Sequence, residues 1–149
     1  MLAAIRRFIA DMSADEHKVT VGEDEVQLAA GALLYHLVAV DGAVTDSERV
    51  MLTDLLSRRF QLDETDAEAL VKAAENAEAE AVDLYTFTSV LKRRLELADR
   101  VRIIEMMWKL VYADGALHEF EDNAIWRVAE LLGVSSETRI GLKQKIRGP

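Results

Sequence analysis

The sequence contains no cysteine among its 149 residues. A chain without cysteine forms no disulfide framework, holds no metal through thiolates and has no cysteine nucleophile. These kinds of site are excluded, and nothing in the cysteine usage points to an oxidising compartment. We therefore expect a cytoplasmic location.

Long apolar runs are also missing, and none approaches the roughly 20 residues that a membrane-spanning helix needs. The first twelve residues, MLAAIRRFIADM, are interrupted by two arginines and lack the apolar stretch of a signal peptide. As a helix they would place Leu2, Ile5, Ile9 and Met12 along one side. We expect this N-terminal helix to dock on the rest of the chain, which we predict is not membrane-spanning.

Basic residues are few, with 18 Lys and Arg against 27 Asp and Glu, and the net charge is -9. Affinity for nucleic acid rests largely on neutralised phosphates, so an acidic chain without a basic stripe is not expected to bind it. The short runs Arg58–Arg59 and Lys92–Arg94 do not change this. The charge favours a divalent cation or a basic protein surface as partner.

Helical periodicity is what the sequence does contain. Its only proline is the last residue, and apolar residues recur at spacings of three and four. The pattern predicts helices over residues 26–40, 46–60, 63–81, 83–95, 98–113, 120–133 and 135–146. In the second of these, the side chains expected to point inward are Val50, Leu52, Leu55, Leu56 and Phe60.

These helices predict an all-α fold, a single domain of about seven to eight helices. A strand over LYTFTSV, the alternative for part of 83–95, would have no second strand to pair with. Residues 13–25 are polar and charged and are the expected linker. We therefore assign residues 1–24 to an N-terminal helix and polar linker, and residues 25–149 to the helical domain.

An acidic turn occurs twice, as VDGAVTDSE over residues 40–48 and as ADGALHEFE over 113–121. The apolar residues before each turn also correspond, 33–38 with 106–111. The two halves, 26–60 and 99–133, each read as helix, Asp-Gly turn, helix. We predict two pseudo-symmetric helix–turn–helix repeats, a duplication rather than a solenoid. Tyr35 and Trp108 occupy equivalent places and are expected to pack in the core between the repeats.

The spacing within each turn matches the back half of an EF-hand loop, with Asp41 at the fifth and Glu48 at the twelfth position. The first and third positions would be Leu37 and Ala39, which cannot ligate calcium. Neither copy is therefore an intact EF-hand.

Helix capping explains part of the pattern. Thr45 and Glu48 have the spacing of a capping box, and Asp46 in the first helical turn suits the helix dipole. In the second copy His118 stands where Thr45 does, and histidine is a poor cap. Asp41 and Asp114 each follow an apolar helix, where the dipole opposes a carboxylate, although an Asx-type turn would offset this.

Ion binding is the other reading of the same residues. If the repeats bring both turns to one face, six carboxylates would share it, and their repulsion favours a counter-ion. Hard oxygen ligands select calcium, magnesium or manganese. The candidate ligands are Asp41, Asp46, Glu48, Asp114, Glu119 and Glu121.

The paired turns, YADG at 112–115 and DLYTFTSVLKRRL before the second repeat resemble the tellurite-resistance TerB-like family, over roughly residues 25–147. The resemblance implies an all-helical fold of two related halves and a cytoplasmic, non-catalytic protein of bacterial stress-response, chaperone-linked or membrane-associated systems. It also implies an acidic face suspected of metal binding, and peripheral membrane association through a membrane-protein partner. By position, the acidic residues of the family fall on the same six carboxylates.

No enzyme site is evident. Of the three histidines, His36 is expected at the edge of the core and His118 exposed in its turn, and neither belongs to a catalytic or zinc motif.

Two functions stay open. One is an accessory domain whose turns bind a divalent cation or present an acidic face. The other is a protein–protein adaptor without metal, in which the carboxylates serve as helix caps and an exposed apolar patch binds the partner.

Overall fold

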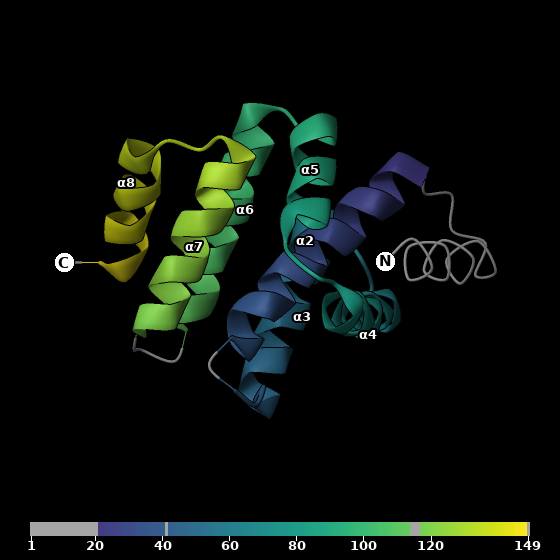
Figure 1. The fold of residues 1–149 in the computed structure, drawn as a ribbon. Helices are drawn as coiled ribbons and strands as arrows, with labels where there is room; N and C mark the ends of the chain where they lie inside the picture. Colours follow the sequence, from purple (N-terminus) through teal and green to yellow (C-terminus); the bar gives the residue numbers. More distant parts are fainter. Residues whose placement is uncertain (1–20, 41, 114–116, 149) are drawn as a thin grey trace.

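The computed structural model describes residues 21–40, 42–113 and 117–148, and in these ranges the chain is helical with no strand. The all-α prediction is confirmed (Figure 1). The helices are α2 (Val21–Ala39), α3 (Asp46–Phe60), α4 (Glu64–Glu80), α5 (Tyr85–Arg94), α6 (Leu97–Tyr112), α7 (Glu119–Leu132) and α8 (Ser136–Arg147).

Helix α2 is the centre of the fold, and it contacts α3, α4, α5, α6 and α7. Its sequence is apolar on almost every side, which is typical of a helix buried all round rather than on one face. Gly31 lets α4 approach closely, since a Cβ atom added at Gly31 would lie 3.1 Å from the Cβ of Ala74. Leu33, Leu34 and Leu37 then fill the core.

Helices α3 to α7 surround α2, and α8 lies beyond α6 and α7, as Figure 1 shows. Helix α5 covers α2 and leads into α6, which runs antiparallel to α7, and α8 packs against α6 and α7. Gly133 ends α7 in the left-handed conformation with φ of 72°, the predicted stop signal. Ser135 caps α8 by accepting a hydrogen bond from the Thr138 backbone N–H at 3.1 Å, also as predicted.

The two residues expected to pack between the repeats are both buried, but each reaches a different later helix. The Tyr35 hydroxyl donates to Glu75 of α4 at 3.0 Å. The Trp108 indole N–H donates to the Arg139 carbonyl of α8 at 3.1 Å. The pseudo-symmetry of the two halves stays a prediction.

Two details differ from the sequence analysis. Helix α2 begins at Val21, so the second part of the expected linker 13–25 is helical. Glu23 and Asp24 in its first turn favour a helix N-terminus. Glu25 forms ion pairs with Arg93 and Arg94 at 3.7 and 3.6 Å. The expected N-terminal helix lies outside the described residues.

The second difference is Val50, which is 69% exposed rather than inward. Leu52 and Leu56 form the buried stripe of α3, one helical turn apart. Val50 precedes Leu52 by two residues, about 200° round the helix, and so faces the opposite side. Met51 and Leu55, next to the stripe, are the ones that pack against the core.

Candidate functional site at the two acidic turns

The first acidic turn connects α2 to α3 through a glycine that no other residue replaces easily. The Gly42 backbone N–H donates to the Ala39 carbonyl at 3.1 Å, which closes the end of α2. Gly42 has a φ of +131°, a conformation that side chains with a Cβ rarely adopt. The glycine of the Asp-Gly pair is thus required by the backbone here, whatever its aspartate does.

A complete capping box begins α3. The Glu48 backbone N–H donates to Thr45 Oγ1 at 3.2 Å, and the Thr45 backbone N–H donates to Glu48 Oε1 at 3.0 Å. The Thr45 hydroxyl also donates to Glu48 Oε1, at 2.9 Å. Capping therefore accounts for the position of Glu48, as one of the two sequence interpretations predicted.

The second turn repeats this arrangement with His118 in the place of Thr45. The His118 backbone N–H donates to Glu121 Oε1 at 3.1 Å, the bond that Glu48 makes in the first copy. Glu121 is only 5% exposed, whereas His118 is exposed, as expected for a turn histidine. The neighbouring Asp122 accepts from Lys143 of α8 at 3.2 Å, a contact that draws α8 onto the start of α7.

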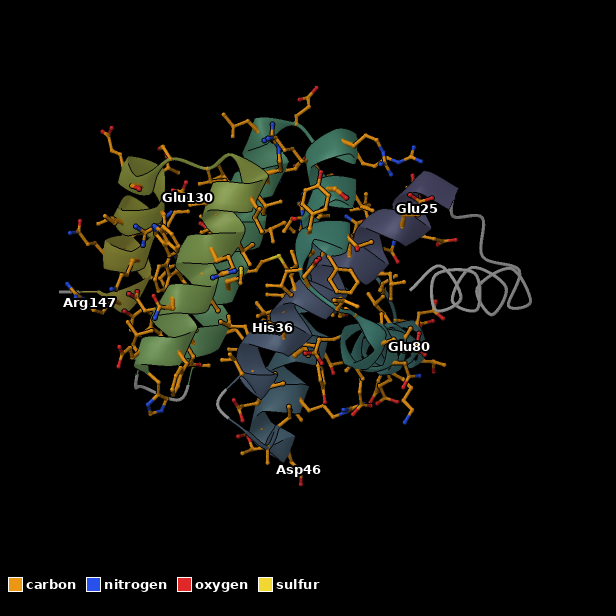
Figure 2. All side chains as sticks on the ribbon, viewed as in Figure 1. Glu25, His36, Asp46, Glu80, Glu130 and Arg147 are labelled. Carbon is orange, nitrogen blue, oxygen red and sulfur yellow. The ribbon has the colours of Figure 1, made fainter. Side chains whose placement is uncertain are left out.

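The other candidate ligands divide into two groups. Asp46 and Glu119 are exposed in the first turns of α3 and α7, where a carboxylate suits the helix dipole. Figure 2 labels Asp46 at the tip of α3, on the outside of the molecule. Asp41 and Asp114, the first carboxylate of each turn, lie outside the described residues.

Both turns open at the same end of the helix bundle. In Figure 1 the C-terminal ends of α2 and α6 and the N-terminal ends of α3 and α7 all lie at the lower side. The packing agrees, because α2 contacts both α6 and α7, and α3 contacts α6. Tyr112 and Ala113, which precede the second turn, line one cavity together with Met51 of α3.

The described carboxylates do not by themselves make an ion site. Within residues 21–40, 42–113 and 117–148, no group of three or more Asp, Glu or His side chains is arranged to hold a metal ion. The predicted site depends on Asp41 and Asp114, one from each turn, and so stays a prediction.

The surroundings of Phe120 and of His36 could hardly be predicted from the sequence. Phe120 is 62% exposed between Glu119 and Glu121, and an exposed aromatic cannot be told from a buried one by residue type. His36 lies at the edge of the core, as expected, with Nδ1 3.2 Å from Glu78 Oε1. Its partner is 42 residues away, so only the fold identifies it.

A buried carboxylate lies far from both turns, in the first helical turn of α2. Asp24 is 2% exposed and its Oδ1 has no hydrogen-bond partner. Burial, and to a lesser extent the charge of Glu23, raises the pKa of Asp24 from 3.8 to about 6. No sequence motif marks this residue, because it reads as an ordinary acidic N-terminus.

Comparison with protein families decides the relationship that the turns suggest. A family model described as Tellurite resistance protein TerB matches residues 27–144, which contain both acidic turns and all helices from α3 to α7. The chain belongs to the TerB family. Neither a curated protein nor a solved structure matches it.

Membership of this family agrees with the all-helical structure of the chain. It also confirms the resemblance that the paired turns indicated. In the ranges that the structure describes, no helix is both long and apolar enough to cross a membrane.

Proposed function

We propose that this TerB protein is a non-catalytic accessory domain of bacterial stress response, and that its two acidic turns together bind a divalent cation. The observation that carries the proposal is the placement of both turns at one end of the bundle. Carboxylates from sequence positions seventy-three residues apart would then act on one ion.

The two turns offer different kinds of carboxylate to an ion. Glu48 and Glu121 are fixed by their capping hydrogen bonds, so their orientation is set before an ion binds. Asp46 and Glu119 are exposed and would reorient at little cost. In the sequence, Asp41 and Asp114 come two residues after the last residues of α2 and α6. The helix dipole disfavours negative charge near such C-terminal ends, and a cation would offset that cost.

The chemistry of this donor set fits calcium, magnesium or manganese. All six candidates offer oxygen, with no thiolate to select zinc, and oxygen donors suit these harder cations. Carboxylates at exposed positions, such as Asp46 and Glu119, favour calcium, which accepts irregular coordination, over magnesium, which needs a nearly ideal octahedron.

Calorimetric titration of the metal-stripped protein with each of the three cations tests the proposal. The decisive variant changes Asp41 and Asp114 to Asn together. The matched control changes Glu80 and Glu130 to Gln, which removes the same charge from exposed positions of α4 and α7. We expect saturable binding by the parent and the control and none by the Asp41→Asn/Asp114→Asn variant. No binding by the parent at millimolar cation would overturn the proposal.

A second function, binding of a basic protein surface, is favoured by Phe120. This ring is exposed beside Glu119, so the same end of the molecule combines an apolar anchor with negative charge. Aromatic side chains often anchor protein interfaces. If the parent binds no cation, this adaptor function becomes the better explanation, with the capped glutamates serving the helices alone.

A further inference from the structure

A groove runs along the outside of α3 and α4, on the side away from α6. It has a volume of about 710 Å3 and is lined by one face of each helix. Ala67 and Val71 of α4 form its floor, and Val50 and Thr53 of α3 stand at its wall. Val50, at 69% exposed, is the side chain that the sequence analysis wrongly placed in the core.

The rim of the groove is acidic. Its two basic side chains, Arg49 and Lys72, both pair with Glu75, at 3.6 and 3.8 Å. Three further rim carboxylates, Asp46, Glu64 and Glu68, have no ion pair among the residues that the structure describes. An apolar floor with an acidic rim suits a helix that is apolar on one side and basic beside it.

We infer that the N-terminal segment of this same chain occupies the groove. The pattern of residues 2–12 places Leu2, Ile5, Ile9 and Met12 on one helical side, and Arg6 and Arg7 follow Ile5 directly. The apolar side would cover Val50, the exposed apolar side chain of the groove, and the two arginines would meet the acidic rim. An amphipathic helix otherwise leaves this apolar side in water.

The connection is long enough for this docking. The groove ends at Ser57 and Glu64, within a turn of Phe60 and Gln61, which line a second cavity together with Glu23 and Val26 of α2. The start of α2 is therefore close to that end of the groove. Residues 13–20 span up to about 28 Å when extended. A helix over residues 2–12 is about 16 Å long, similar to the α3 stretch that lines the groove.

Thiol labelling of the full-length chain tests the inference, because the protein has no cysteine of its own. In a Val50→Cys variant, docking would cover the new thiol. Changing Ile5 and Ile9 to Asp in that background removes the apolar side of the segment. If nine-tenths of the molecules are docked, the rate of labelling by a maleimide rises about tenfold on this change. Gln144→Cys, at an exposed position of α8, is the control and should label equally fast with and without the two substitutions.

Equal labelling of Val50→Cys in both backgrounds would overturn the inference. A second full-length variant, Ile5→Cys with Val50→Cys, tests contact directly. With copper phenanthroline and dissolved oxygen as the oxidant, we expect a disulfide within one molecule, at a rate independent of protein concentration, and far slower formation for Ile5→Cys with Gln144→Cys. Disulfide-linked dimers in place of the internal bond would mean that a second copy fills the groove, and would equally reject docking within one chain.

The test is independent of the ion proposal. The groove shares Asp46 with the candidate ion ligands. The substitutions used for labelling, at residues 5, 9, 50 and 144, leave all six candidate carboxylates in place, so cation binding and N-terminal docking can each fail while the other holds.

Discussion

Thr45 and Glu48 hold each other in place at the start of α3. Glu48 Oε1 accepts from the Thr45 backbone N–H and from the Thr45 hydroxyl, at 3.0 and 2.9 Å, and the Glu48 N–H donates to Thr45 Oγ1 at 3.2 Å. This reciprocal pair sets the direction in which the chain leaves the first acidic turn. The start of α7 has the same capping-box geometry with His118 in the place of Thr45, and there the His118 backbone N–H donates to Glu121 Oε1 at 3.1 Å.

Removing the threonine hydroxyl should weaken the protein by about 1 kcal/mol, the usual cost of an N-cap replaced by alanine. Thr45→Ala leaves the Glu48 N–H without its partner and removes one donor to Glu48 Oε1. Urea unfolding followed by circular dichroism measures the change. Thr86→Ala, at an exposed position of α5, is the control and should change the free energy of unfolding by less than about 0.5 kcal/mol. An equal loss in both variants would contradict the capping role.

Supplying a better cap at the second turn should have the opposite effect. His118→Thr places a hydroxyl where Thr45 has one, while Glu121 still accepts from the backbone N–H of residue 118. We expect a gain of about 0.5–1 kcal/mol in the free energy of unfolding. His118→Ala, which removes the ring without adding a cap, should show no such gain. If both variants stabilise equally, the imidazole itself is unfavourable and the cap plays no part.

Asp24 should make stability depend on pH in an unusual direction. Its pKa is 3.8 in a model peptide and about 6 in the folded chain, so between these values the folded state binds the proton more tightly. This contribution to stability is present at low pH and is lost as pH rises from about 4 to about 6. Asp24→Asn removes the buried charge, so we expect it to stabilise the protein at pH 7 by about 1–2 kcal/mol, after allowance for solvent screening.

Thermal unfolding of Asp24→Asn and of the parent at a series of pH values checks this, because the other carboxylates cancel in the difference. The stability gain should be small at pH 4 and largest above pH 6. Glu130→Gln, an exposed change on α7, provides the control with a flat difference. A gain that does not change with pH would show that Asp24 titrates normally.

Much of the fold could be predicted because the local signals agree with one another. The three-and-four spacing, Gly133 at the end of α7 and Ser135 at the start of α8 each specify a helix or its limit within a few residues. Failures arose where tertiary contacts decide. Val50 and Leu52 are both apolar residues of one helix, and only the position of α2 and α4 determines which of them is buried.

The same distinction applies to the candidate site: contacts between residues close in sequence could be predicted, and long-range contacts could not. The capping part could be read from Thr45 and Glu48, since their partners are three residues apart. Long-range partners such as Lys143 for Asp122 and Glu78 for His36 leave no local pattern. The burial of Asp24 was equally hidden, because an acidic residue in a first helical turn is usually exposed and favourable.

Trp108 should decide whether α8 stays attached. No side chain of α8 is fully buried, and the contacts that hold it include the Trp108 N–H to the Arg139 carbonyl at 3.1 Å and Lys143 Nζ 5.4 Å from the Trp108 ring centre. Trp108→Phe removes the hydrogen bond and leaves a cavity, at an expected cost of about 1–3 kcal/mol. Because α8 depends on these contacts, hydrogen exchange of its backbone amides should be faster in the Trp108→Phe variant than in the parent. The amides of α2 should change less. Hydrogen exchange followed by mass spectrometry measures both, with Trp126→Phe at an exposed position of α7 as the control. Uniformly faster exchange in α2 and α8 would mean that Trp108 supports the whole core rather than the docking of α8.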